Sequence, residues 1–128
     1  MSSDLVFQHE RVDDLQIDNL KIIQNPDWFC FGTDAVLLSD FASKTIKKDA
    51  KILDLCSGNG IIPILISSKS KASKIYGLEI QECVEEMAER SIKLNNLEDK
   101  ITDLMLENDY KQDYVFSATC TDNKVVIK

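Results

Sequence analysis

The fold of this chain is decided by the stretch KILDLCSGNG at residues 51–60. Residues 51–56 are apolar nearly throughout, which is typical of a short strand buried in a parallel sheet. Residues 57–60 have the composition of a tight turn. The following segment, 61–68, continues as a helix with Pro63 in its first turn, where no intrahelical donor is lost. The stretch therefore predicts a strand, a glycine turn and a helix in direct succession.

The same alternation continues downstream. Residues 75–80 predict a second strand, 81–95 an amphipathic helix, and a third strand falls within 101–106. Strands that alternate with helices form parallel sheets with right-handed crossovers. Beyond them, residues 113–117 and 124–127 each have the pattern of a further strand.

Upstream, residues 15–17 and 20–22 alternate in polarity around Asp18-Asn19, which predicts a β-hairpin. A helix is expected from Ala35 onward, with Thr33 or Asp34 as its N-cap. Its apolar residues recur at helical spacing and predict a buried face; they are Leu37, Leu38, Phe41 and Ala42. The expected fold is α/β: a Rossmann-like core with an incomplete parallel sheet at 49–128, preceded by a hairpin and helix subdomain at 1–48.

Polar residues and glycines meet at one edge of the predicted sheet. Ligands of α/β sheets bind outside the carboxyl ends of the strands, where Asp54, the 57–60 turn and Glu79 would lie. Glycines at 58 and 60 let a ligand approach the backbone, and the following helix offers free N–H groups. Glu79, 19 residues after Gly60, is placed to accept hydrogen bonds from two ribose hydroxyls. The combination predicts a nucleoside cofactor.

The glycine spacing distinguishes between cofactors. The dinucleotide pattern G-x-G-x-x-G and the phosphate-binding pattern G-x-x-x-x-G-K-[ST] are both absent. The chain instead reads Asp54-x-Cys56-x-Gly58-x-Gly60, the G-x-G-x-G form that binds S-adenosylmethionine, with Cys56 in place of the first glycine. The alternative is a packing turn that binds no nucleotide, and Glu79 favours the cofactor over it.

Composition narrows the class of protein. The 128 residues suffice for one domain, and a net charge of −7 argues against nucleic-acid binding by these residues alone. No apolar run has the length of a membrane span and the N-terminus is not a signal peptide, so a cytoplasmic location is expected. One histidine and no Cys-x-x-Cys pair leave no metal site. The four cysteines are expected as free thiols, with Cys56 and Cys83 as packing residues.

Five stretches resemble one known family in unbroken order: residues 10–15, 20–24, 31–38, 52–66 and 76–81. The family is the bacterial valine-tRNA adenine-N6 methyltransferases, which modify an adenine beside the anticodon. The resemblance covers roughly residues 10 to 101, and Phe-Gly-Thr-Asp-Ala-Val-Leu-Leu at 31–38 is its most specific part.

The resemblance implies a class I methyltransferase fold that binds S-adenosylmethionine. In it, Asp54 and the 56–60 turn would hold the methionine part of the cofactor, Glu79 the ribose, and Ile80 would pack on the adenine. Residues 31–34 would approach from the N-terminal side, and Asp109 is the candidate contact for the adenine amino group. The implied cofactor-binding set is Gly32, Thr33, Asp34, Asp54, Cys56, Ser57, Gly58, Asn59, Gly60, Glu79, Ile80 and Asp109.

One departure from the family concerns the substrate. Its members carry Asn-Pro-Pro-Tyr/Phe after the fourth strand, which binds the amine and stacks on the flipped-out base. Here the only prolines are Pro26 and Pro63, so no catalytic residue is assigned. The first hypothesis is the cofactor-binding N-terminal part of a tRNA adenine-N6 methyltransferase, cut short by truncation or frame disruption near residue 103 or later. The alternative is a non-catalytic S-adenosylmethionine-binding or interaction module that dimerises through an exposed sheet edge.

Overall fold

The computed structural model describes residues 4–105, 118–121 and 124–127. Helices and strands alternate from residue 51 to residue 105, as the sequence predicts. The elements are β1 (Arg11–Asp14), β2 (Lys21–Gln24), α1 (Thr33–Ser43), β3 (Lys51–Leu55), α2 (Ile61–Lys69), β4 (Lys74–Glu79), α3 (Glu82–Leu94), β5 (Ile101–Met105), β6 (Ala118–Thr121) and β7 (Lys124–Ile127).

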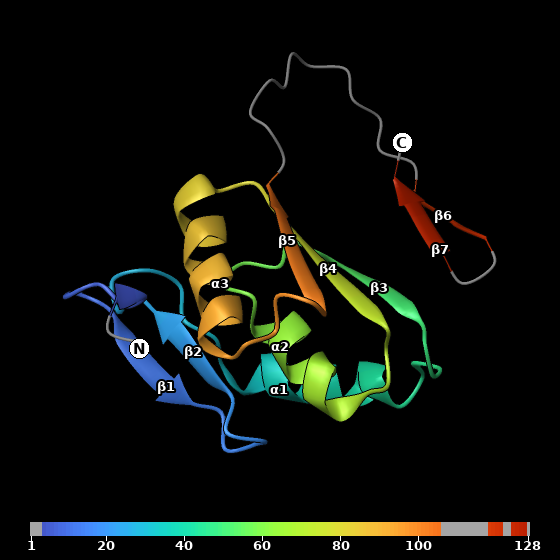
Figure 1. Ribbon diagram of the computed structural model, residues 1–128, viewed down its shortest axis with the longest axis horizontal. Helices are drawn as coiled ribbons and strands as arrows, with labels where there is room; N and C mark the ends of the chain where they lie inside the picture. The colour runs from blue at the N-terminus through green and yellow to red at the C-terminus, as the bar shows by residue number, and fades with distance from the viewer. Residues whose placement is uncertain (1–3, 106–117, 122–123, 128) are drawn as a thin grey trace, which may run out of the picture.

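A three-stranded parallel sheet with the order β3-β4-β5 forms the centre of the molecule. In its register Asp54 pairs with Gly77, and Gly77 pairs with Asp103 on the other side. Helices α2 and α3 pack against β4 and β5, and α1 packs against α2 (Figure 1). The expected α/β class with an N-terminal hairpin, a helix and a parallel sheet is confirmed.

The hydrophobic core lies between the sheet and these helices. Ile64 of α2 and Ile75 of β4 are fully buried, and Ile92 of α3 and Ile101 of β5 pack in the same cluster. Leu20, from the loop of the N-terminal hairpin, belongs to this cluster too. The hairpin and the sheet therefore share one core.

The N-terminal hairpin is confirmed, but its strands lie further from the turn than expected. Strands β1 and β2 pair with Arg11 opposite Gln24, so residues 15–20 form the loop. Asp18 and Asn19 sit at its tip with positive φ angles of 49° and 57°. The predicted first strand at 15–17 was wrong because Leu15 and Ile17 pack against the core from the loop.

Helix α1 differs from the expectation in two ways. Its N-cap is Gly32, without a side-chain cap, so Thr33 and Asp34 lie inside the first turn and cap nothing. The predicted buried face is also wrong, because Leu37 and Phe41 are 63% and 70% exposed. The helix instead packs on α2 through its other side, where Ser39 is fully buried and accepts a hydrogen bond from Lys69.

Near the C-terminus β6 and β7 form an antiparallel pair. The predicted strand at 124–127 is confirmed as β7. The other predicted strand, 113–117, lies outside the described residues.

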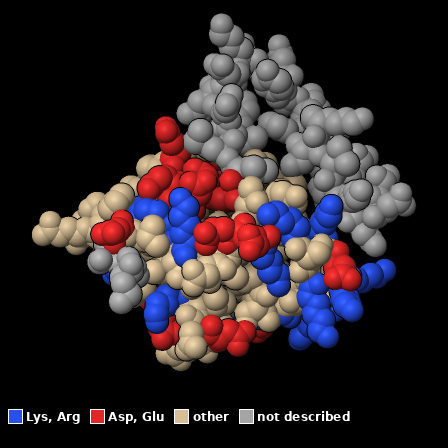
Figure 2. Space-filling model, in the orientation of Figure 1, with Lys and Arg blue, Asp and Glu red and all other residues tan. Residues whose placement is uncertain are grey.

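Acidic side chains gather over α3 on the face shown in Figure 2. Its first turn carries Glu82 and Glu85. In the part of the chain that the structure describes, no helix has the length and apolar character to cross a membrane.

Candidate cofactor-binding site

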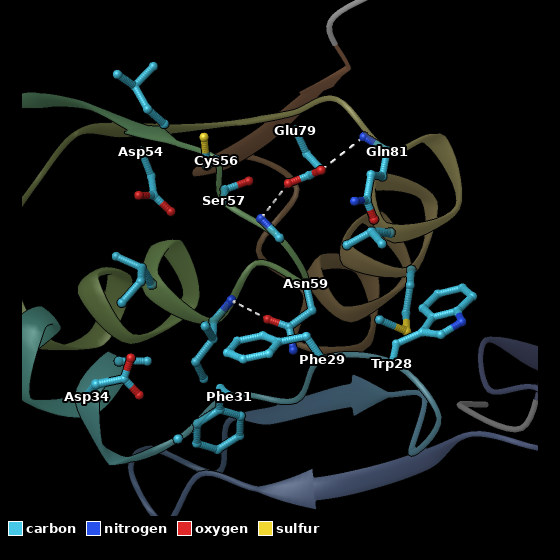
Figure 3. A pocket seen from close by; sticks show the side chains of 18 of the residues that line it. Trp28, Phe29, Phe31, Asp34, Asp54, Cys56, Ser57, Asn59, Glu79 and Gln81 are labelled. Atoms are coloured by element: carbon cyan, nitrogen blue, oxygen red, sulfur yellow. Dashed lines mark hydrogen bonds between the residues drawn. The ribbon is translucent and has the colours of Figure 1, made fainter.

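A cleft of about 700 Å³ opens at the carboxyl ends of β3 and β4 (Figure 3). One wall is the 54–59 stretch with Glu79, and the segment 28–32 before α1 faces it in the view. Its size is in the range of small-molecule and cofactor sites. The lining residues are Trp28, Phe29, Phe31, Gly32, Asp34, Ala35, Leu38, Asp54, Leu55, Cys56, Ser57, Gly58, Asn59, Ile61, Ile62, Glu79, Gln81, Cys83, Val84 and Met87.

The turn between β3 and α2 has an unusual backbone that glycine makes accessible. Gly58 and Gly60 have φ angles of 58° and 85°, and Cys56 adopts 58° although it carries a side chain. A Cβ on Gly58 would meet nothing within 4 Å, so this part of the turn borders open space. The turn leads into α2, where the Asn59 side chain accepts a hydrogen bond from the Ile61 N–H at 3.3 Å. A ligand can therefore reach the backbone at Gly58.

Glu79 ties the end of β4 to this turn. Its Oε1 accepts a hydrogen bond from the Gly58 N–H at 3.0 Å, and its Oε2 accepts from the Ile80 and Gln81 N–H groups at 3.0 and 2.9 Å. The side chain is 7% exposed and lines the cleft. A carboxylate has about four acceptor positions, so Glu79 keeps capacity for a hydroxyl donor in the cleft.

Asp54 lies on the same wall at the end of β3. Its Oδ2 is buried and has no hydrogen-bond partner among the residues that the structure describes. Burial raises the pKa of this carboxyl to about 6. A buried acceptor without a partner calls for an explanation, and a cationic or donor-bearing ligand in the cleft would supply one.

The structure brings most of the expected binding residues together. The cleft is lined by Gly32, Asp34, Asp54, Cys56, Ser57, Gly58, Asn59 and Glu79. Thr33, Gly60 and Ile80 lie outside the lining, although Ile80 directly follows Glu79 and is 46% exposed. Asp109 lies outside the described residues.

Some lining residues were not identified from the sequence. Trp28 and Phe29 contribute aromatic surface, and Phe29 is 90% exposed. An aromatic cluster outside any periodic element was their only sequence signal. Cys56 and Cys83 are exposed and line the cleft, which contradicts their assignment as packing residues, because the turn and the start of α3 direct them to the cleft.

Comparison with known proteins shows which protein family has this sequence and fold. Residues 40–128 match the family model of the TRM5/TYW2 methyltransferase domain. A curated relative is the ribosomal protein L11 methyltransferase of Carboxydothermus hydrogenoformans, 33% identical over 96 residues. That match covers 72% of this chain and 30% of the relative, so the chain spans about a third of the relative's length.

Solved structures of low identity share the fold. The chain is similar to the Methanocaldococcus jannaschii tRNA m1G37 methyltransferase, with a TM-score of 0.64 and 20% identity over 77% of this chain and 30% of that one. It is also similar to M. jannaschii TYW2 in complex with AdoMet, with a TM-score of 0.64 and 14% identity over 77% and 44% of the two chains. These relatives are Rossmann-like S-adenosylmethionine-dependent methyltransferases, and the chain belongs to the TRM5/TYW2 methyltransferase domain family.

Proposed function

We propose that this chain binds S-adenosylmethionine in the cleft between the 56–60 turn and Glu79. The observation that carries the proposal is the Glu79 carboxylate, held at the carboxyl end of β4 by the Gly58, Ile80 and Gln81 N–H groups. A carboxylate in that place is suited to bind the two ribose hydroxyls of a nucleoside. The open space at Gly58 leaves room for the neighbouring part of the cofactor.

The charge of the cleft supports a cationic cofactor. S-adenosylmethionine supplies a methyl group on a positively charged sulfonium. The carboxyl groups of Asp34, Asp54 and Glu79 all line the cleft, and among the described residues no lysine or arginine lines it. The buried Asp54 Oδ2 without a partner would accept a donor from the amino-acid part of the cofactor. In this proposal Gly32, Cys56, Ser57 and Asn59 form the remaining contacts, and Thr33, Gly60, Ile80 and Asp109 keep the supporting roles that the resemblance implies.

For the substrate, we propose an adenine amine of tRNA, methylated on N6 by the whole protein. The resemblance over residues 10–101 supports this substrate, and the matched family contains tRNA methyltransferases. Catalysis would depend on holding the amine in line with the sulfonium. Residues 31–34 of the hairpin and helix subdomain at 1–48 would approach the cofactor from the N-terminal side, and residues 49–128 would form the rest of its site. The location proposed is cytoplasmic.

A second candidate is a non-catalytic cofactor-binding module that dimerises. The favouring observation is at the sheet edge: within the described residues β3 forms ladder hydrogen bonds only with β4, although β7 lies against it, and Leu55 at its end is 58% exposed. An unpaired strand edge is a template for pairing with another chain.

Calorimetric titration of the 128-residue chain with S-adenosylmethionine tests the cofactor proposal. We expect binding, and we expect Glu79→Ala to weaken it by about ten-fold or more, since hydrogen bonds to a charged group are lost. Glu79→Gln, which keeps one acceptor for the Gly58 N–H, should be intermediate. Glu98→Gln, at an exposed position in the turn between α3 and β5, is the matched control. Equal affinities of all three variants and the parent would refute the cofactor proposal.

Methyl transfer assays separate the substrate hypotheses. The chain is incubated with S-adenosylmethionine and either transcribed valine tRNA or ribosomal protein L11. Transfer to tRNA at an adenine amine supports the proposal, whereas transfer to the protein would overturn it. Cofactor binding without transfer, together with a dimer in sedimentation velocity, supports the second candidate.

A further inference from the structure

Asp103 is a buried carboxylate that the cleft does not use directly. It lies in the middle of β5, is 9% exposed, and is absent from the cleft lining. Its Oδ1 accepts a hydrogen bond from the Ser57 hydroxyl at 3.2 Å, while its Oδ2 is buried and has no partner within residues 4–105, 118–121 and 124–127. A buried charge is destabilising by several kcal/mol unless compensated, so an acid in this strand calls for an explanation.

The neighbouring strand β4 has a glycine, Gly77, next to the hydrogen bond between Ser57 and Asp103. Gly77 of β4 pairs with Asp103, and a Cβ added to Gly77 would lie 2.6 Å from the Asp103 Oδ1 and 2.7 Å from the Ser57 Oγ. A glycine inside a strand commonly marks such a close approach. The space that a side chain would occupy here contains the contact between Ser57 and Asp103.

Ser57 in turn fixes the turn above the sheet. Its N–H donates to the Leu78 carbonyl at 2.9 Å, and its carbonyl accepts from the Gly60 N–H at 3.1 Å. The residues on either side, Cys56 and Gly58, both have left-handed φ angles of 58°. Such backbone persists only where surrounding contacts hold it. The hydroxyl of Ser57 joins the turn to β5 through Asp103, in addition to the contact of Gly58 with Glu79 of β4.

We propose that Asp103 is a positioning residue for the cofactor turn: through Ser57 it holds the 57–60 backbone so that Gly58 faces Glu79 and the cleft. This inference rests on the proposed function, because it assigns Asp103 to the same cofactor site. Asp103 acts from behind the turn and touches no ligand.

Ionisation of Asp103 modulates the strength of this anchor. Burial raises its pKa to about 7, and Glu85 and Glu89 of α3 and Glu79 of β4 add to the effect, while the Ser57 hydrogen bond lowers it. The ionised carboxylate accepts a shorter and stronger hydrogen bond than the neutral acid. We therefore expect the turn to be held more firmly, and cofactor affinity to rise, as the pH increases through about 7.

The test compares Asp103→Asn, Ser57→Ala and the double variant with the parent and with the Glu98→Gln control. Affinities for S-adenosylhomocysteine and S-adenosylmethionine are measured from pH 6 to 8.5, by calorimetry and by the fluorescence of Trp28, the single tryptophan, which lines the cleft. We expect each single variant to weaken both ligands by a similar factor of about ten. The double variant should be no weaker than Ser57→Ala, because Asp103 acts only through the Ser57 hydroxyl.

Comparison of the two ligands distinguishes a positioning role of Asp103 from a direct effect of its charge on the sulfonium. S-adenosylhomocysteine lacks the sulfonium charge, so a positioning role affects both ligands, while a direct field effect affects S-adenosylmethionine alone. Asp103→Asn should also remove the part of the rise in affinity centred near pH 7, which the parent and Glu98→Gln retain, and leave the part near pH 6 that ionisation of Asp54 contributes. A loss confined to S-adenosylmethionine, or a lower melting temperature with unchanged affinity and pH profile, would overturn the proposal.

Amide hydrogen exchange keeps this proposal separate from the proposed function. In the ligand-free chain, Asp103→Asn should speed exchange at Ser57, Gly58 and Gly60 and leave the amides of α2 unchanged. If the parent binds neither ligand, the cofactor proposal fails, and faster exchange confined to the turn would still support the anchor. Unchanged exchange at the turn would refute the anchor whatever the ligands do.

Discussion

Two carboxyl groups on the helix-facing side of the sheet titrate in an unusual range. Burial raises the pKa of Asp54 to about 6 and that of Asp103 to about 7, from an ordinary value of 3.8. Both flank Gly77 in the strand register, and each has one buried oxygen without a partner. The folded chain therefore binds these protons more tightly than the unfolded chain does.

The consequence is a stability that falls as the pH rises. The contribution of each group is fully present below about pH 3.8 and is lost as the pH rises through the folded value, near 6 for Asp54 and near 7 for Asp103. We expect Asp54→Asn and Asp103→Asn each to flatten the decrease in the free energy of unfolding between about pH 4.5 and 7.5. Urea denaturation at about pH 4.5 and about pH 7.5 measures this decrease in the free energy of unfolding for the parent and for each variant.

Glu85 is the internal comparison for this prediction. Burial and the neighbouring Glu89 raise its pKa to about 7 as well, and Glu85 is present in both variants. Part of the decrease in the free energy of unfolding with pH should therefore persist in Asp54→Asn, in Asp103→Asn and in their combination. A slope in Asp103→Asn as steep as that of the parent would contradict the titration assigned to Asp103.

At the scale of elements, helix α3 is tied to the N-terminal segment by one arginine. Arg90 donates to both oxygens of Glu10 at 2.5 and 2.7 Å, to the Leu5 carbonyl at 2.7 Å and to Glu86. Its guanidinium also lies 3.8 Å from the centre of the Phe7 ring. The side chains of Arg90 and Glu10 are only 9% and 1% exposed, so the pair is shielded from water.

Removal of one partner of this pair should be strongly destabilising. We expect Arg90→Met to lower the free energy of unfolding by about 3–5 kcal/mol, because Glu10 would stay buried without its cation. Arg90→Met combined with Glu10→Gln should recover much of the loss. Lys93→Met, at an exposed position of the same helix, is the control and should change little. Urea denaturation measures the free energy of unfolding of each variant. If Arg90→Met were as stable as the variant that also carries Glu10→Gln, this account would be disproved.

The elements differ in how far the sequence predicts them. Strand β3 and helix α2 agree with expectation within a residue, because glycines at 58 and 60 mark the turn between them. Helix α1 was also expected, but its exposed face was not, since helical spacing shows only that Leu37 and Phe41 share a side of the helix. Whether other residues cover that side depends on tertiary packing.

The candidate site shows the same limit. Glu79 and the turn could be predicted because each follows a strand, and parallel strands end at one edge of the sheet. Asp103 could not, because its partner Ser57 is 46 positions away and the pair meets only through the strand register beside Gly77. Side-chain partners across a sheet follow from the fold and not from local pattern.

At the scale of the whole molecule, apolar residues divide sharply between a core and an uncovered surface. Ile64 of α2 is fully buried, whereas Leu37 and Phe41 of α1 are mostly exposed. The chain spans 30% of the length of its curated relative. The described part is stabilised by two buried apolar clusters, one around Ile64 and Ile75 and one around Ile22 and Leu65.

A pair of equivalent truncations tests this division. We expect Ile64→Ala to lower the free energy of unfolding by about 2–5 kcal/mol, as a buried aliphatic truncation does. Leu37→Ala removes a similar side chain from a surface position and should change it by less than about 0.5 kcal/mol. Thermal and urea unfolding of both variants measure the difference. Comparable losses would show that the face of α1 is covered in solution.

The position of two cysteines makes the cleft open to chemical footprinting. Cys56 and Cys83 are exposed thiols on different sides of the same cavity, one at the turn and one at the start of α3. Cys30 is half-buried and lies outside the lining, so it provides a reference thiol. Alkylation followed by mass spectrometry would then report occupancy residue by residue in the natural sequence, with protection at Cys56 and Cys83 and none at Cys30.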